Sequence, residues 1–326
     1  MKQLPQNPEI SVPSTDILLN SHRFQHEAMA SIFEIIIIYE DTKYARQAAH
    51  AAFDELDRIE LQLSRFIENS DISQINNLDA GQPLLIGLDA FECLRLSKHI
   101  SEETNGAFDV TIGRLFSCWL SKDRTLLSPS KEELDFACEH TGSNLIILNE
   151  LEHTAELSAS PVHVDLGGIG KGFAVDRMAD ILRQWSIDAA LIHGGCSTVF
   201  AIGAPGAKKG WPVTISNPKD RKQTLAYLDL CDQALSGSGL QKGRHIIDPR
   251  TQQPIEVRLA AWSSAPDAAT ADALSTAFMV MDTKEIQQYC LKYPDTMAMV
   301  VLQEKSCEQK EKILQFGPWK IDKTHS

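Results

Sequence analysis

The residues with the clearest chemical potential in this sequence form a glycine cluster. Between Asp165 and Asp176, an apolar stretch runs into four glycines within six residues and then into a helical pattern. Glycines let the backbone come close to a ligand, and the free N–H groups at a helix start bind phosphate. Lys171 stands near that start, where the helix dipole disfavours a cation unless an anion is bound. The cluster fits a phosphate-binding loop, and it equally fits a tight strand-to-helix turn with a solvated lysine.

Two familiar nucleotide-binding fingerprints do not describe this cluster. A dinucleotide-binding GxGxxG that begins at Gly168 requires glycine where Phe173 stands. A Walker A loop that ends in Lys171 requires Ser or Thr at the next position, which is Gly172. The loop is therefore competent for phosphate but belongs to neither class.

A second candidate is an acid and an alcohol one helical turn apart. Asp272 and Thr276 share one face of a predicted helix, and Ser275 lies beside them. A carboxylate with hydroxyl oxygens suits a hard cation such as Mg²⁺, which keeps several waters and takes further ligands from phosphate. A D-x-x-x-T pair alone is more often an exposed helix start, so the pair gains weight only together with the glycine cluster.

Three further segments carry polar or reactive groups. His245 precedes a short apolar stretch that closes on the turn Asp248-Pro249, and it could contact phosphate or carry a proton. Residues 236–239 form a hydroxyl-rich segment that we interpret as a plain loop. Cys196 follows a glycine pair, but buried inert cysteines are commoner than reactive ones. No GxSxG motif occurs, which argues against a serine hydrolase.

The periodicity of apolar residues predicts the elements that position these groups. Helices are expected at residues 41–66, 89–103, 173–185, 268–281 and 283–291. Strands are expected at residues 32–39, 144–148, 162–166, 189–192, 198–202, 212–215, 225–230, 245–247, 259–262 and 297–302. Because strands and helices do not alternate regularly, we predict an α+β fold with largely antiparallel sheet, in one compact body of two intimately packed lobes.

Composition narrows the class of protein further. The 326 residues carry a net charge of −13, which argues against nucleic acid as a partner. The seven cysteines include no CxxC pair, so neither a disulfide framework nor a cysteine-based zinc site is expected. No run of 18 apolar residues occurs, so the sequence predicts no membrane span. The proline-rich start lacks the pattern of a secretion signal, so we expect a cytoplasmic protein. A true start upstream of this chain would permit a periplasmic or membrane-anchored location.

Taken together and in order, eight segments resemble the FAD:protein FMN transferase family, the ApbE-like flavin transferases. They are residues 29–31, 55–66, 71–76, 106–119 and 164–176, the GGC segment at 194–196, HIIDPRT at 245–251 and ATADALST at 269–276. The resemblance spans roughly residues 24–303, so we assign residues 1–23 to an irregular tail and 24–326 to one flavin transferase domain. It implies a T-fold-like architecture.

The resemblance also implies an activity. Such an enzyme binds FAD and Mg²⁺, cleaves the pyrophosphate and moves FMN onto a threonine or serine hydroxyl of an acceptor flavoprotein, releasing AMP. Two alternatives stay open: an Mg²⁺-dependent FAD pyrophosphatase that gives FMN and AMP, and a non-catalytic flavin-binding protein.

Roles for individual residues follow from the resemblance. Metal ligands would be Asp272, Thr276, the adjacent Ser275 and the carbonyl of Gly168. His245 and Asp272 are candidates for the general base, with no assignment between them. The residues expected along FAD are Met29, Phe66, Ala107, Phe108, Asp109, Asp165, Lys171, His245 and Ile246.

Three positions depart from the family pattern. Cys196 stands where an acidic or amide residue is frequent, and Val110 follows Asp109 where proline is frequent. The start is Met29-Ala30-Ser31 rather than Met-Gly-Thr. These departures affect the expected substrate contacts and leave the metal pair unchanged.

Overall fold

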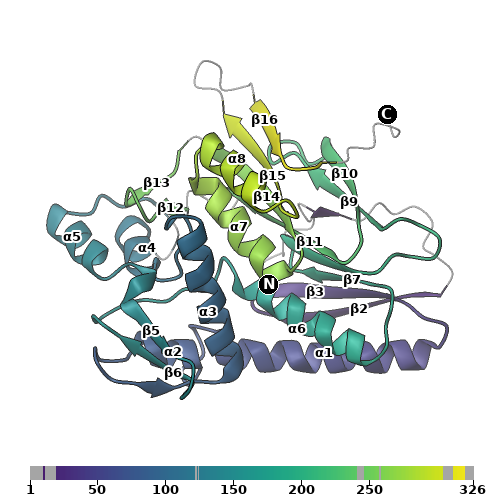
Figure 1. Cartoon of the computed structure of the whole chain (residues 1–326), viewed down its shortest axis with the longest axis horizontal. Coiled ribbons are helices and arrows are strands. Elements are labelled where there is room, and N and C mark those ends of the chain that lie inside the picture. Colours follow the sequence, from purple (N-terminus) through teal and green to yellow (C-terminus); the bar gives the residue numbers. More distant parts are fainter. Residues whose placement is uncertain are drawn as a thin grey trace.

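A sheet of eight antiparallel strands forms the central layer of the protein (Figure 1). The computed structural model describes residues 10–11, 20–121, 123, 125–240, 246–256, 258–303 and 311–319. From one edge of the sheet to the other, the strands are β16 (Glu311–Phe316), β15 (Met297–Gln303), β14 (Arg258–Ala265), β11 (Gln233–Gly239), β8 (Thr198–Ile202), β7 (Ala190–Gly194), β3 (Ser31–Ile38) and β2 (Ser21–Ala28).

Helices cover one face of this sheet (Figure 1). They are α1 (Thr42–Leu63), α6 (Gly170–Gln184), α7 (Ala268–Val280) and α8 (Thr283–Lys292). The helix α1 begins where Asp41 accepts hydrogen bonds from the backbone N–H groups of Lys43 and Tyr44. Alternate β3 residues, such as Phe33 and Ile35, pack against the apolar faces of these helices and form the main core.

A smaller sheet covers the opposite face. Its strands are β1 (Ile10–Ser11), β9 (Trp211–Ser216) and β10 (Thr224–Leu230). Trp211 and Val213 of β9 pack against Val199 and Trp262 of the large sheet in a second core. The large sheet is therefore buried on both faces, which explains the nearly continuous apolar pattern of its middle strands.

The remaining elements build a second lobe beside the sheet, seen at the left of Figure 1. It contains α2 (Asp71–Asn76), α3 (Leu88–Glu103), α4 (Gly113–Trp119), α5 (Lys131–Glu139), a 3₁₀ turn (Ser143–Leu145), and strands β4 (Leu84–Leu85), β5 (Ile146–Asn149), β6 (Thr154–Leu157), β12 (Ile247–Asp248) and β13 (Gln253–Pro254). The main core is continuous across the two lobes. The predicted α+β, largely antiparallel fold in one compact body of two lobes is confirmed.

Three local expectations are wrong. Residues 21–23, assigned to the irregular tail, belong to the edge strand β2, and Ile10–Ser11 of the same tail pairs with β9. Residues 236–239 belong to the buried strand β11 and not to a loop. Residues 162–166 make only an isolated bridge, between His163 and Ile112, because their neighbours are loops and not strands.

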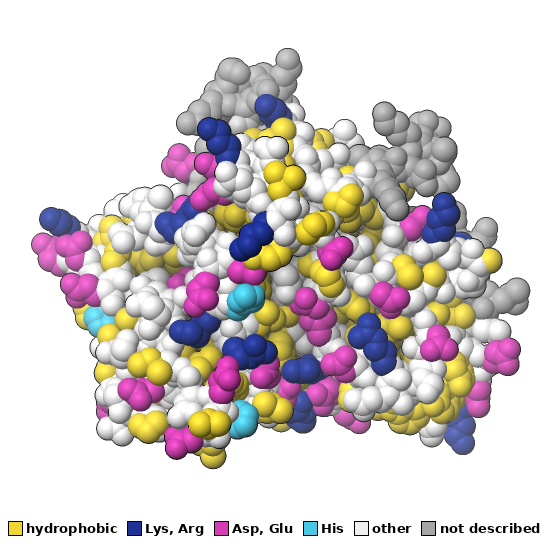
Figure 2. Space-filling model, viewed as in Figure 1, with side chains coloured by type: hydrophobic (Ala, Val, Ile, Leu, Met, Phe, Trp, Pro, Cys, Tyr) yellow, Lys and Arg dark blue, Asp and Glu magenta, His cyan; other side chains and the backbone are white. Residues whose placement is uncertain are grey.

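The composition of the helices and the charge on the surface bear on which partners the protein could have. In the part of the chain that the structure describes, no helix has both the length and the apolar composition that crossing a bilayer would need. Acidic and basic side chains are interspersed over the face seen in Figure 2. This face therefore lacks the continuous basic surface that binds phosphate backbones.

Candidate functional site

The site begins where α6 starts against the first turn of α7. A Cβ atom on Gly172 would lie 2.1 Å from the carbonyl oxygen of Ala268 and 2.8 Å from the Cα of Ala269. Only glycine permits this approach of two helix backbones. The glycine cluster therefore sets the contact between α6 and α7 as well as the shape of the loop before α6.

Each of the two helices contributes one carboxylate that accepts hydrogen bonds from the backbone of the other helix. Asp272 of α7 accepts a hydrogen bond from the backbone N–H of Gly172 at 3.1 Å. Asp176 of α6 accepts hydrogen bonds from the N–H groups of Ala268 and Ala269 at 2.7 and 2.8 Å. Each acid thus satisfies free N–H groups in the first turn of the other helix, where the helix dipole favours negative charge.

Asp176 makes the stability of the protein sensitive to pH. Burial, with a contribution from the nearby charge of Asp267, raises the pKa of Asp176 to about 7. The folded protein therefore binds the proton of the Asp176 carboxyl group more tightly than the unfolded chain does. The stability that this proton contributes is lost as pH rises from about 4 to about 7. We expect urea unfolding of the wild type to show this decline, with a slope of at most about 1.4 kcal/mol per pH unit. The Asp176→Asn variant should lack that component, and parallel stability curves for the two proteins would contradict this account.

Asp272 lies inside a network of hydroxyl groups. The residue is 4% exposed, and its carboxylate accepts hydrogen bonds from Ser236 at 3.1 Å and Thr198 at 3.4 Å. These two hydroxyls also contact each other at 2.9 Å. A residue that is only a surface ligand would not be buried in this way, so Asp272 also contributes to the packing of α7 on β8 and β11.

The two alcohols after Asp272 face the same strand. Ser275 donates to the carbonyl of Asp272 at 2.8 Å, and its hydroxyl lies 2.8 Å from that of Ser238 on β11. The hydroxyl of Ser238 also lies 3.1 Å from that of Thr276. Asp272, Ser275 and Thr276 thus give α7 one side that carries oxygen-bearing side chains.

Gly168 brings the glycine loop to these oxygens. A Cβ atom on Gly168 would lie 3.1 Å from Oγ1 of Thr276 and 3.3 Å from the ring of Phe108. The structure therefore places Gly168, Thr276 and Phe108 in contact, although they come from three distant parts of the sequence.

Charged groups also border the glycine loop. Asp165 accepts a hydrogen bond from the N–H of Gly167 at 2.9 Å and pairs with Arg65 at 3.2 Å. The guanidinium of Arg65 lies 4.4 Å from the ring centre of Phe66, whose side chain is 82% exposed. Phe66 therefore offers an aromatic face to solvent close to Asp165.

Lys171 also borders the glycine loop. Its ammonium donates to the carbonyl of Gly167 at 3.4 Å. Its Cδ atom lies 3.8 Å from the position of a Cβ on Gly195, in the turn between β7 and β8. The glycine loop and the glycine pair, distant in sequence, are therefore neighbours across Lys171.

We next compared the chain with families of known proteins. The model of the ApbE family matches residues 29–301 of the chain. The chain belongs to the ApbE family. The match includes the glycine loop, the glycine pair and the α7 acid and alcohols, and so covers every part of the site described above.

Individual relatives agree with this ApbE assignment. The FAD:protein FMN transferase of Salmonella typhimurium is 27% identical over 278 residues, covering 80% of this chain and 79% of that protein. The enzyme of the same name from Haemophilus influenzae is 29% identical over 243 residues, covering 69% and 70%. The crystal structure of the ApbE protein from Thermotoga maritima matches with a TM-score of 0.79 and 26% identity, covering 91% of this chain and 97% of that one.

Two other predicted ApbE site residues, Met29 and Ile246, occupy distinct positions. Met29 and Ala30 form the tight turn between β2 and β3, both with positive φ, of 50° and 54°. The hydroxyl of Ser31, just after this turn, lies 2.4 Å from the position of a Cβ on Gly195. Met29 therefore reaches the same end of the sheet as Lys171. Ile246 is buried, and its carbonyl accepts a hydrogen bond from the N–H of Ile255.

The segment at 107–109 faces the site only in part. The side chain of Phe108 is buried against Gly168, and Ala107 is buried as well. The carboxylate of Asp109 accepts three hydrogen bonds, two from Thr111 and one from the N–H of Ser143. Burial raises the pKa of Asp109. Its side chain therefore holds this loop together. His245, the other candidate base and predicted FAD contact, lies outside the described residues.

Sequence reasoning missed four side chains that complete the site. Thr198 and Ser236 bind the carboxylate of Asp272, Ser238 contacts both α7 alcohols, and Arg65 holds Asp165. Alternation of small polar residues over 233–239 was the available signal for β11. Arg65 lies next to Phe66 within a segment that carried the resemblance, but no residue pattern linked it to Asp165.

Proposed function

We propose that this protein transfers FMN from FAD to a threonine or serine hydroxyl of an acceptor flavoprotein, releasing AMP, with Mg²⁺ as cofactor. The observation that carries the proposal is the contact of the glycine loop with the acid and alcohols of α7 at Gly168 and Thr276. Relatives named FAD:protein FMN transferase support the choice of reaction.

The donor set fits Mg²⁺ by its chemistry. Among the described residues, no three His, Cys, Asp or Glu side chains gather into a metal cluster. Mg²⁺ does not need one, because it is held by one or two carboxylates together with waters and substrate phosphates. Asp272, with three of its four lone-pair positions occupied, has one left, and Ser275, Thr276 and the Gly168 carbonyl add oxygens.

The reaction breaks one phosphoanhydride bond. The acceptor hydroxyl gives up its proton, which passes to solvent, and its oxygen forms a bond to the FMN phosphorus. The bond from that phosphorus to the AMP oxygen breaks, and AMP leaves with the electron pair. Bound Mg²⁺ would neutralise charge on the transferring phosphoryl group. The ammonium of Lys171 would hold the diphosphate, and the exposed ring of Phe66 would contact a planar part of FAD.

The deciding experiment uses purified protein, FAD, Mg²⁺ and candidate acceptors that carry Ser or Thr followed by Gly-Ala-Thr. Mass spectrometry should show covalent FMN on the acceptor hydroxyl, and AMP should appear in equal amount. Release of AMP and free FMN without an acceptor would instead establish the pyrophosphatase. Stoichiometric binding of intact FAD, with no product in any reaction, would establish a flavin-binding protein.

Lys171→Ala should weaken FAD binding about tenfold, roughly 1.4 kcal/mol, because one cation near the diphosphate is lost. Its stability should be unchanged or slightly higher, because a lysine in the first turn of a helix opposes the helix dipole. Isothermal titration of FAD measures the first effect and thermal unfolding the second. Lys131→Ala, which removes an exposed lysine from the first turn of α5, is the matched control. Equal FAD affinity in both variants would contradict a contact between Lys171 and the diphosphate, and would indicate a lysine that is only solvated.

A further inference from the structure

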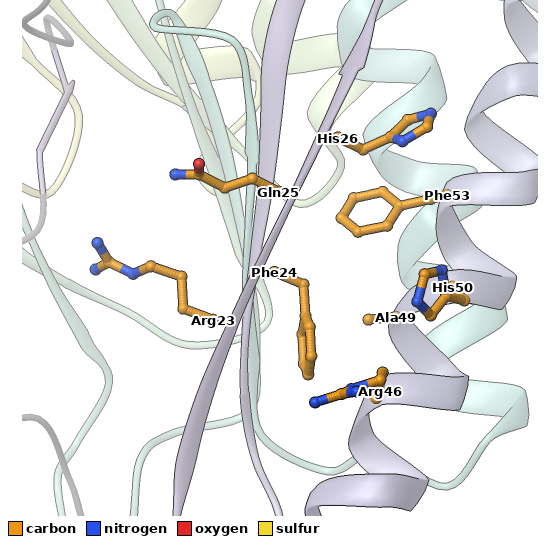
Figure 3. A pocket seen from close by; sticks show the side chains of 8 residues that line it. All are labelled: Arg23, Phe24, Gln25, His26, Arg46, Ala49, His50 and Phe53. Carbon is orange, nitrogen blue, oxygen red and sulfur yellow. The ribbon is translucent and has the colours of Figure 1, made fainter.

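An open groove runs along the edge of the large sheet, between β2 and α1 (Figure 3). Its volume is about 440 Å³. Residues 23–26 of β2 line one side, and Arg46, Ala49, His50 and Phe53 of α1 line the other. Because residues 23–26 point alternately to both faces of the sheet, the groove includes the free edge of the strand itself.

The backbone of β2 offers unpaired hydrogen-bonding groups along this edge. The N–H of Tyr39 donates to the carbonyl of Asn20, which fixes the alternation of paired residues in the β2–β3 ladder. Asn20 and every second residue after it face β3, so Arg23, Gln25 and Glu27 direct their N–H and C=O groups away from the sheet. In the described part of the chain, β2 has β3 as its one neighbour. This edge can therefore accept an added strand.

The groove is cationic in an acidic protein. Arg46 is exposed, and no ion pair to it occurs among the described residues. Arg23 has a 57% exposed side chain and only a 3.6 Å contact with Glu34, which Gln25 also binds at 2.6 Å. The net charge of the chain is −13, so this pair of arginines stands out as a local attraction for acidic groups.

The groove leads toward the site. Both β2 and α1 run toward the end of the sheet where the Met29 turn and the Arg65–Asp165 pair lie. His26, at the groove end nearest the site, stacks on Phe53 and contacts Asp57 at 2.7 Å. From His26 to Met29 the strand advances three residues, or roughly 10 Å.

We infer that this groove binds an extended, acidic segment of the acceptor protein, which pairs with β2 as an added strand and places its acidic side chains at Arg46 and Arg23. Strand addition supplies affinity through the backbone, and the arginines select the charge of the segment. The acceptor hydroxyl would then lie beyond the Met29 end of the groove. This inference rests on the proposed function, because the occupant is the substrate of that site.

The test uses the full chain with Arg46→Glu, and with Arg95→Glu as a control that reverses the charge of an exposed arginine on α3, outside the residues that line the groove. Arg46→Glu should raise KM for the acceptor at least about tenfold and leave kcat and the FAD affinity within about twofold. Two 12-residue peptides, repeats of Thr-Thr-Glu-Glu and of Thr-Thr-Lys-Lys, serve as direct probes, because each places its charges on both faces of an added strand, toward Arg46 and toward Arg23. The acidic peptide should bind the wild type, compete with the acceptor and slow amide exchange in residues 21–28.

The outcomes separate this inference from the proposed function. Normal KM for Arg46→Glu, or equal binding of the two peptides, would overturn the docking site even if FMN transfer is established. A wild type that transfers no FMN would overturn the proposed function, and peptide binding and amide exchange would still decide whether the groove takes acidic strands. Loss of acceptor affinity in Arg95→Glu as well would show a general charge effect and overturn the assignment to the groove.

Discussion

Asp272→Asn should lower kcat for FMN transfer by about a thousandfold or more, roughly 4 kcal/mol, while the protein stays folded. The substitution removes the single carboxylate among the α7 oxygens that contact the glycine loop. An amide oxygen is a much weaker ligand for Mg²⁺ than a carboxylate, and it supplies no charge to hold the ion. Transfer measured by mass spectrometry over a range of Mg²⁺ concentrations should therefore not recover at saturation.

Asparagine is a sharper test than alanine because Asp272 is buried. Its carboxylate accepts hydrogen bonds from Gly172, Ser236 and Thr198. Alanine would leave these donors without a partner, at a cost of about 1–3 kcal/mol for each buried group. Asparagine can accept from the N–H of Gly172, and its amide can donate to the two hydroxyls, which rotate to accept. Activity then falls for a chemical reason and not through unfolding.

Asp267→Asn is the matched control. Asp267 caps α7 by accepting a hydrogen bond from the N–H of Thr270 at 2.7 Å, and asparagine caps helices equally well. The variant removes one negative charge from the same helix without touching the α7 oxygens. It should keep transfer within about threefold of the wild type. Full activity of Asp272→Asn at high Mg²⁺ would contradict the metal-ligand role.

Much of the fold can be predicted from local sequence pattern, and the elements that were missed have physical reasons for their weak pattern. The apolar spacing in 41–66 predicted α1 to within a few residues, because a long amphipathic helix carries strong periodicity. The helix expected at 268–281 also agrees with α7 to within a few residues, although α7 is buried on nearly all sides. The strand β2, with the sequence SHRFQHEA, has few apolar residues because it is an edge strand with one exposed face. A pattern of this kind is also typical of a loop.

The candidate site was predictable only on the side where one segment carries several of its groups. The glycine cluster and the α7 acid and alcohols are short motifs with local spacing, so residue types alone indicated them. Ser236 and Ser238 required knowledge of which strand packs under α7. Because β11 pairs with β8 and β14, from distant parts of the chain, only tertiary structure places its serines.

Gly172→Ala should destabilise the protein by roughly 3 kcal/mol or more, which is at or beyond the usual range for an overpacked core. The new methyl group would lie 2.1, 2.6 and 2.8 Å from three backbone atoms of Ala268 and Ala269. A side chain can rotate away from a clash, but a helix backbone cannot, so α6 and α7 must separate. Urea unfolding should show a large fall in the midpoint, or the variant should fail to accumulate as folded protein.

Gly170→Ala controls for the general effect of alanine in the same helix. Its new methyl group would meet only Cβ of Leu166 at 3.5 Å, an ordinary contact, so its stability should stay within about 0.5 kcal/mol of the wild type. Comparable losses in the two variants would show that the close approach at Gly172 does not limit stability. Separation of α6 from α7 would also lengthen the hydrogen bond from Gly172 to Asp272 and draw the loop at Gly168 away from Thr276. Any folded Gly172→Ala protein should therefore bind FAD weakly, because one glycine fixes both the helix contact and the geometry of the site.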